Sequence, residues 1–239
     1  MSKCIPCSKL RCLSGSMLKL IAVVSMLIDH SALLLGAEIP LLTFPLLGDK
    51  ITVYYIMRKI GRLAFPIFCF LISEGLVHTR DRSRYILRLF CFAVISELPF
   101  NILVSGNLFY AGKQNVFFTL LLGSLLICIS ERERSEGENA ILMAFILAVA
   151  VLIKPDYGLS GVILILLIYC FRTRPALQAV TAYPLLSGGF AALAAFIPIN
   201  LYNHRRGFIK SPALKYAFYI FYPLHILLLA AVKFGLRAL

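Results

Sequence analysis

Long apolar runs separated by short polar joints occupy most of this chain. Eight of these runs have the length and composition of membrane helices. They cover residues 18–36, 58–77, 85–104, 115–130, 139–153, 157–171, 177–200 and 215–236. Backbone amides in lipid must find their hydrogen-bond partners within the protein, which favours helices for such runs. The pattern predicts an all-α fold, a polytopic transmembrane helix bundle with about eight or nine membrane helices.

Composition supports a membrane protein and changes the meaning of its charge. The 239 residues are 60% hydrophobic and 15% charged, whereas about a quarter of the residues in soluble domains are charged. The formal net charge of +13 would indicate nucleic acid in a soluble protein. Here most cations lie in the joints, so an orientation signal is favoured and no nucleic-acid partner is expected. A basic site for a polyanion such as coenzyme A is the alternative. No metal site is predicted, since the lone pair Cys4 and Cys7 lacks a full ligand set.

The basic residues predict how the chain is oriented. Under strict alternation of the runs, one side of the membrane receives the cations of residues 3–19, 80–88, 132–134 and 172–174. The positive-inside rule makes this side cytoplasmic. We therefore expect a cytoplasmic N-terminal tail, residues 1–17, and a single transmembrane domain, residues 18–239.

One segment conflicts with this alternation. The cations of residues 205–215 would lie outside if residues 177–200 crossed the membrane once. That run contains Pro184, Gly188 and Gly189, which disfavour one continuous helix. Two half-helices that return to the cytoplasmic side are therefore an open alternative.

The pair Asp29-His30 is unusual because it lies inside the first apolar run. An acid at the centre of a bilayer costs about 2.5–3.5 kcal/mol on insertion scales. His30 follows Lys19 by eleven residues, which at about 1.5 Å per residue puts it roughly 16 Å deep, near the midplane. A neutral imidazole there can take a proton from an amine or hydroxyl and return it to a thiolate. A histidine packed against a neighbouring helix is the alternative.

Asp29 points about 100° away from His30 on a helix, so we do not expect it to orient the imidazole ring. Arg58 and Arg62 lie one turn apart at the start of the second run, and either could neutralise Asp29. A purely structural network of ion pairs is the alternative for these residues.

Further polar candidates lie on other runs. Glu74 and Glu97 could orient the ring of His30 or hold an acceptor, and Asn115 or Tyr222 could donate a hydrogen bond to an oxyanion. His225, in the last run, could line the same cavity. For a phosphorylated ligand, the expected cations are Lys19, Arg58, Arg62, Arg80, Arg82 and Arg84.

Six blocks of this sequence, taken in order, resemble the TraX family. They are LKLIAVVSMLIDHSALL, IGRLAFPIFCFLISEGLVHTR, RYILRLFCFAVISELPFNI, QNVFFTLLLG, DYGLSGVILI and FYIFYPLHILLL. That family is named for a membrane protein that acetylates the N-terminus of conjugative pilin. The first and last blocks are also similar to the wider membrane acyltransferase group. In that group an arginine precedes the histidine by eleven positions, where this chain has Lys19 and His30.

The resemblance implies acetyl-CoA as the donor, entering from the cytoplasm, and His30 as the base in acyl transfer. We therefore expect a multi-pass acyltransferase of the bacterial cytoplasmic (inner) membrane, in which His30, Asp29, Glu74 and Glu97 serve catalysis. Its acceptor would be an amine or a hydroxyl, on the N-terminus of pilin or on another surface or secreted molecule such as a glycan. A secondary transporter and a non-enzymatic assembly factor are the alternatives.

Overall fold

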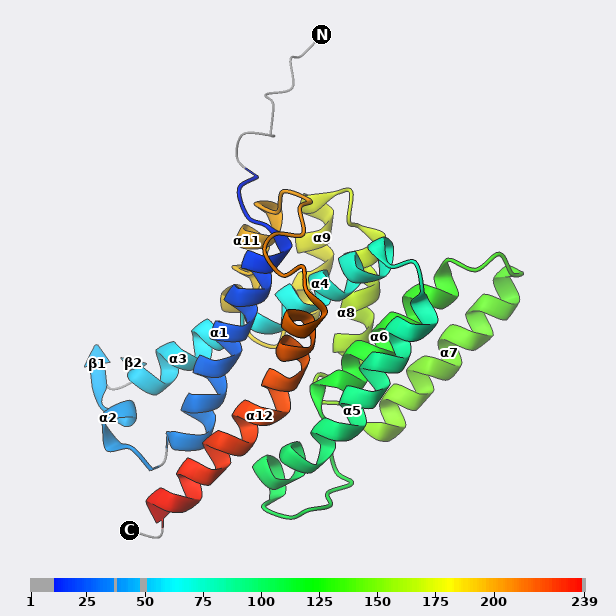
Figure 1. Cartoon of the computed structure of the whole chain (residues 1–239). Helices are drawn as coiled ribbons and strands as arrows, with labels where there is room; N and C mark the ends of the chain where they lie inside the picture. The colour runs from blue at the N-terminus through cyan, green and yellow to red at the C-terminus, as the bar shows by residue number, and fades with distance from the viewer. Residues whose placement is uncertain (1–10, 37, 48–50, 238–239) are drawn as a thin grey trace.

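A computed structural model describes residues 11–36, 38–47 and 51–237 of the chain (Figure 1). Residues 1–10 of the predicted N-terminal tail, with Cys4 and Cys7, lie outside the described residues. Helices dominate, with one short antiparallel hairpin of two strands. The elements are α1 (Gly15–Leu35), α2 (Pro40–Thr43), β1 (Pro45–Leu47), β2 (Ile51–Thr52), α3 (Val53–Gly61), α4 (Ala64–His78), α5 (Arg82–Ser105), α6 (Val116–Ser130), α7 (Glu136–Ile153), α8 (Gly158–Cys170), α9 (Pro175–Ala182), the 3-10 turn η2 (Tyr183–Leu185), α10 (Phe190–Leu193), α11 (Phe196–Asn200) and α12 (Pro212–Arg237).

The apolar runs form membrane-type helices, as the sequence predicts. In the described residues, five helical segments are long and apolar enough to cross a bilayer, and α6 and α8 are shorter apolar helices. α1 begins three residues before the predicted run, because Ser14 caps it by accepting a hydrogen bond from the amide of Met17 at 3.3 Å. The predicted second run is divided between α3 and α4 by a turn at residues 62–63. The chain is a membrane helical protein.

The helices form one bundle around α4 and α6 (Figure 1). α1 packs against α3, α4 and α12, while α5 packs against α6 and α12. α8 lies against both α4 and α6, so these two helices are surrounded and carry much of the apolar core. α7 lies at the edge of the bundle, where its contacts are with α6 and α8. α1 and α12 therefore lie side by side, although they come from opposite ends of the chain.

The segment 177–200 is not one continuous helix. It is broken into α9, η2, α10 and α11, with Gly189 at a φ of +57° between η2 and α10. After α11 the chain returns to the start of α1, where the amide of Gly15 donates to the carbonyl of Arg205 at 2.8 Å. A broken segment that ends beside the start of α1 agrees with the alternative of half-helices that return to the cytoplasmic side. This segment does not add a continuous span to the predicted count.

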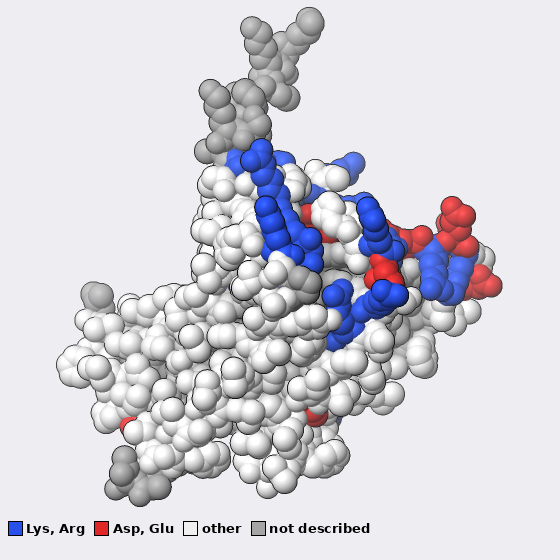
Figure 2. All heavy atoms as spheres, viewed as in Figure 1, with Lys and Arg blue, Asp and Glu red and all other residues white. Residues whose placement is uncertain are grey.

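This return explains the cations that conflicted with alternation. Ser16 donates a hydrogen bond from its hydroxyl to the carbonyl of Arg206 at 2.7 Å, so residues 205–206 lie beside the N-terminal end of α1. Figure 2 shows Lys and Arg gathered at this end of the molecule, above a nearly uncharged surface. The cations that conflicted with alternation therefore lie with those at the start of α1, on the side that the positive-inside rule predicts to be cytoplasmic.

Candidate active site

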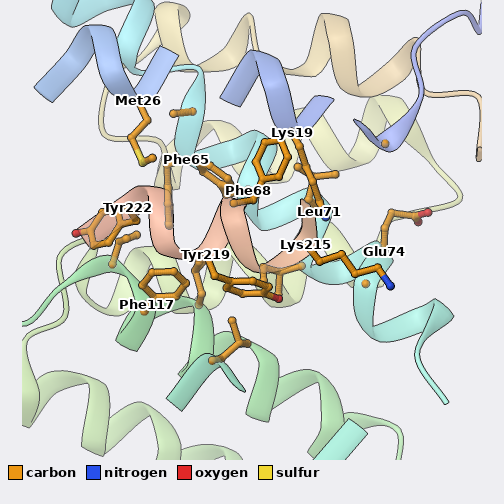
Figure 3. A pocket seen from close by; sticks show the side chains of 18 of the residues that line it. Lys19, Met26, Phe65, Phe68, Leu71, Glu74, Phe117, Lys215, Tyr219 and Tyr222 are labelled. Carbon is orange, nitrogen blue, oxygen red and sulfur yellow. The ribbon is translucent and has the colours of Figure 1, made fainter. Parts of the chain in front are cut away.

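A cavity of about 540 Å³ runs through the bundle between α1, α4, α6 and α12. Three helices each line it with a stripe of side chains spaced three, four or seven residues apart, as expected for one helix face (Figure 3). The stripes are Lys19, Met26 and His30 on α1; Phe65, Phe68, Leu71 and Glu74 on α4; and Lys215, Tyr219 and Tyr222 on α12. Lys19, Glu74 and Lys215 lie together at one end of the cavity (Figure 3).

His30 lies near the other end of these stripes and pairs with His225 of α12. Nδ1 of His30 is 2.6 Å from Nε2 of His225, and the two ring planes lie within 8° of each other with centroids 4.9 Å apart. The ring of Tyr222 approaches that of His30 edge-on, at 6.1 Å between centroids. His225 is 4% exposed, so this His30–His225 pair is shielded from the surface on the side of α12.

The hydrogen bonds of the His30–His225 pair fix the tautomers of both rings. Nδ1 of His225 lies 2.7 Å from the carbonyl oxygen of Phe221, which can only accept, so this Nδ1 carries the proton. In a neutral ring, Nε2 of His225 is then an acceptor, and it takes its hydrogen bond from Nδ1–H of His30. This leaves the lone pair of His30 on Nε2, the nitrogen that a general base needs free.

Asp29 is held by Arg58 rather than by His30. Nη1 of Arg58 lies 2.7 Å from Oδ2 of Asp29, and both side chains are mostly buried. Gly61, one turn after Arg58, permits this contact, because a Cβ there would collide with the Asp29 side chain. Of the two arginines that the sequence offered as partners, Arg62 lies instead against Gly188 of the broken segment. Asp29 lines the cavity, whereas its ion-pair partner Arg58 does not.

Glu97 and Asn115 form a structural unit outside the cavity lining. Asn115 caps α6, since its Oδ1 accepts from the amide of Phe117 at 3.0 Å. Its Nδ2 donates to Glu97 at 2.6 Å and to the carbonyl of Ala93 at 2.7 Å. Both amide protons are thereby used, so the structure does not bring Asn115 to His30 as a donor.

The end of the cavity marked by Lys19 is basic, and we define this basic end by Lys19, Arg88, Arg206 and Lys215, all of which line the cavity. Among the described residues, none of these four cations forms an ion pair with a carboxylate. Such unpaired cations at an opening are suited to a phosphorylated or otherwise anionic ligand.

Glu74 and Tyr202 also line the basic end. Oε2 of Glu74 lies 3.4 Å from Nε2 of His78. Burial, together with the charge of Glu74, raises the pKa of Tyr202 to about 12. The hydroxyl of Tyr202 therefore stays protonated at neutral pH and donates its hydrogen bond to the side chain of Glu74.

The three arginines predicted beside Lys19 are elsewhere on the same side of the molecule. Arg82 pairs with Glu131, and Arg84 pairs with Asp81 at 2.9 Å. Arg80 is exposed in the joint before α5. None of the three is among the residues that line the cavity, so the structure separates them from Lys19.

Phe65 and Tyr157 also line the cavity, and their rings stack with centroids 3.4 Å apart. Asp29 and Asp156 line the cavity as well, and Asp156 pairs with Lys113 at 2.7 Å. We define the acidic end of the cavity by Asp29 and Asp156. In the part of the chain that the structure describes, no group of three His, Cys, Asp or Glu side chains could hold a metal ion.

Sequence reasoning missed Arg88, Arg206, Lys215, Asp156 and Tyr157 as cavity residues. A signal was available for Lys215, because it lies four and seven residues before Tyr219 and Tyr222 and therefore on the same helix face. Arg206 and Asp156 lie in joints, where periodicity carries no information.

Comparison with known proteins identifies the family to which this chain belongs. The family described as TraX protein matches residues 14–233. The chain is also 32% identical over 251 aligned residues to a probable fimbrial assembly protein FimC, serogroup H1, of Dichelobacter nodosus, covering 94% of this chain and 97% of that protein. No solved structure matches. A match over most of the chain, from before α1 to within α12, shows that this protein belongs to the TraX family.

Proposed function

We propose that this protein is a membrane acyltransferase that moves an acetyl group from acetyl-CoA to an amine. One observation carries the proposal. A histidine with its lone pair fixed on Nε2 lies inside a cavity whose other end is lined with unpaired cations. A general base for acyl transfer and a site for the phosphates of coenzyme A require these two features.

The cavity suits the shape and charge of acetyl-CoA. The cations of the basic end would hold its phosphates. Phe68, Leu71 and Phe117 form an apolar passage toward His30 (Figure 3), which suits the narrow, weakly polar arm that carries the thioester. Lys19 and His30 are eleven residues apart on α1, about 16 Å at the helical rise.

The chemistry would use Nε2 of His30 twice. As the acceptor nitrogen attacks the thioester carbonyl, Nε2 takes a proton from it and a carbon–nitrogen bond forms. The carbon–sulfur bond then breaks, and the leaving thiolate takes that proton back from Nε2. His225 keeps Nδ1 of His30 as the donor throughout, so it positions the ring without taking part in the transfer. Tyr222, whose ring lies 6.1 Å from that of His30, would supply its hydroxyl to the developing oxyanion.

The carboxylates of the acidic end favour an amine as the acceptor. Asp29 and Asp156 line the cavity, and Oδ1 of Asp29 is buried without a hydrogen-bond partner among the described residues. A buried carboxylate oxygen in this position could accept a hydrogen bond from an ammonium or amine group. The similar Dichelobacter protein is named for fimbrial assembly, which agrees with the N-terminal amine of a pilin-type subunit. We accordingly propose the bacterial inner membrane as its location.

The test is acetyl transfer by the purified full-length protein in lipid nanodiscs, with radiolabelled acetyl-CoA. The acceptors are membrane extract and two short peptides, one with a free α-amine and one with that amine blocked. We expect transfer to the extract and the free amine, and a loss of about 10²–10⁴-fold in His30→Ala with acetyl-CoA binding retained. Leu33→Ala is the matched control, because Leu33 is 47% exposed on the same helix and does not line the cavity. Equal turnover in wild type and His30→Ala would remove His30 from the chemistry.

A further inference from the structure

The chain between α11 and α12 runs alongside the residues that precede α1 (Figure 1), and it divides into two sets of residues. The even-numbered residues Tyr202, His204 and Arg206 line the cavity. The odd-numbered residues form main-chain hydrogen bonds with the segment before α1. These bonds join Leu13 to Leu201 at 2.9 Å and to Asn203 at 2.8 Å, and Gly15 to Arg205 at 2.8 Å. A pairing between opposite ends of the chain therefore places one side of the basic end.

Ser16 completes this pairing with its side chain. Its hydroxyl donates to the carbonyl of Arg206 at 2.7 Å and accepts from the amide of Ile209 at 2.9 Å. Ser16 is 1% exposed and Ile209 is 2% exposed, so water does not replace these bonds. A hydroxyl can donate and accept through the same atom, which most polar side chains cannot. One buried oxygen thus holds both ends of the bend at residues 206–209.

The bend at residues 206–209 packs directly on the first residues of α1. Gly207 has a φ of +84°, a conformation that glycine adopts readily and other residues rarely do. A Cβ added at Gly207 would lie 2.8 Å from the Cβ of Ser16, and closer still to the hydroxyl oxygen of Ser14. The bend therefore fits only while it stays in this contact, and a shift of the bend would carry Arg206 with it.

We propose that Ser16 is a positioning residue for the donor site, because it fixes the bend that brings Arg206 to the basic end. This inference rests on the proposed function, since it takes acetyl-CoA to be the ligand of the basic end. Without the hydroxyl of Ser16, the buried amide of Ile209 loses its acceptor, and a buried donor without a partner is costly. The bend would then open toward water and take Arg206 out of the cavity, while Arg88 on α5 would stay in place.

The test is a double-mutant cycle on the binding of radiolabelled acetyl-CoA to the full-length protein in nanodiscs, without any acceptor. Ser16→Ala and Arg206→Gln should each weaken binding about fivefold, as expected for the loss of one charge contact. The double variant should also bind about fivefold more weakly than the wild type, because Ser16 acts through Arg206. Ser16→Ala combined with Arg88→Gln should weaken binding about 25-fold, since those two losses are independent. A general loosening of the protein would instead weaken binding equally in both backgrounds.

Ser14→Ala is the matched control, because Ser14 caps the same end of α1 through the amide of Met17 and does not line the cavity. It should keep wild-type affinity for acetyl-CoA. Wild-type affinity in Ser16→Ala, or a further fivefold loss in the Arg206→Gln background, would overturn the inference and leave the proposed function in place. Absence of acetyl-CoA binding by the wild type would overturn both. Should Ser16→Ala fail to fold, Gly207→Ala displaces the same bend and takes its place in the cycle, with the same expected outcomes.

Discussion

The two ends of the cavity hold their charges in different ways. At the basic end, Lys19 and Lys215 line the cavity without an ion-pair partner among the described residues. At the acidic end, Asp29 is paired with Arg58 and Asp156 with Lys113. Cations without ion-pair partners attract an anion through their summed field, whereas paired groups inside a bundle hold each other in position. The basic end should therefore tolerate substitution and the acidic end should not.

The largest effect should come from His225. In His225→Ala, Nδ1–H of His30 loses its acceptor, so the ring can turn or adopt the other tautomer. We expect kcat to fall about 10²-fold or more, with an unchanged KM for acetyl-CoA. His225→Gln offers an amide oxygen as a substitute acceptor and should recover part of the loss. A merely structural role would lower both variants equally, in proportion to folded protein.

The next effect concerns stability at the acidic end. Arg58→Met leaves Asp29 as an uncompensated charge among packed helices. We expect a loss of about 3 kcal/mol in the free energy of unfolding, measured by detergent-induced unfolding followed by circular dichroism. Asp29→Asn in the Arg58→Met background should restore most of it, because the stranded charge is then gone. If the double variant is no more stable than Arg58→Met, the pair is not what stabilises this region.

Much of the fold could be predicted from the sequence, because the membrane imposes simple rules. Apolar length fixed the existence of the helices, and the cost of a buried charge singled out Asp29 and His30. The family resemblance is confirmed over residues 14–233. The path of residues 177–200 stayed open, since prolines and glycines indicate a break but not its direction.

The candidate site was harder to predict than the helices. Which polar residues meet depends on the rotation of each helix about its axis, and this is set by packing against neighbours. Glu97 is an example, because its position in an apolar run suggested chemistry while the structure pairs it with the cap of α6. Arg88 was an unremarkable cation in sequence, yet its place on α5 brings it to the basic end. The roles of these residues stay predictions.

A smaller effect is expected at the basic end. Lys19→Gln, Arg206→Gln and Lys215→Gln should each raise the KM for acetyl-CoA about fivefold and leave kcat unchanged, since one exposed or partly exposed charge contact contributes about 1 kcal/mol. The increase should shrink in high salt, because exposed charges are screened. Arg174→Gln removes an exposed cation that does not line the cavity and serves as the control. A fall in kcat rather than a rise in KM would mean that these cations act on the chemistry.

The smallest effect should come from Glu97→Gln, which tests a carboxylate that does not line the cavity. Glutamine keeps an oxygen that can accept from Nδ2 of Asn115, so the cap of α6 should survive and activity should stay within about twofold of wild type. Glu97→Ala removes that oxygen and should cost about 1 kcal/mol of stability, seen in the same unfolding assay. A catalytic carboxylate behaves in the opposite way, since its glutamine variant folds but loses turnover. If Glu97→Gln loses turnover while remaining folded, the chemistry reaches beyond the cavity lining, and the division between a tolerant basic end and a fixed acidic end no longer describes the site.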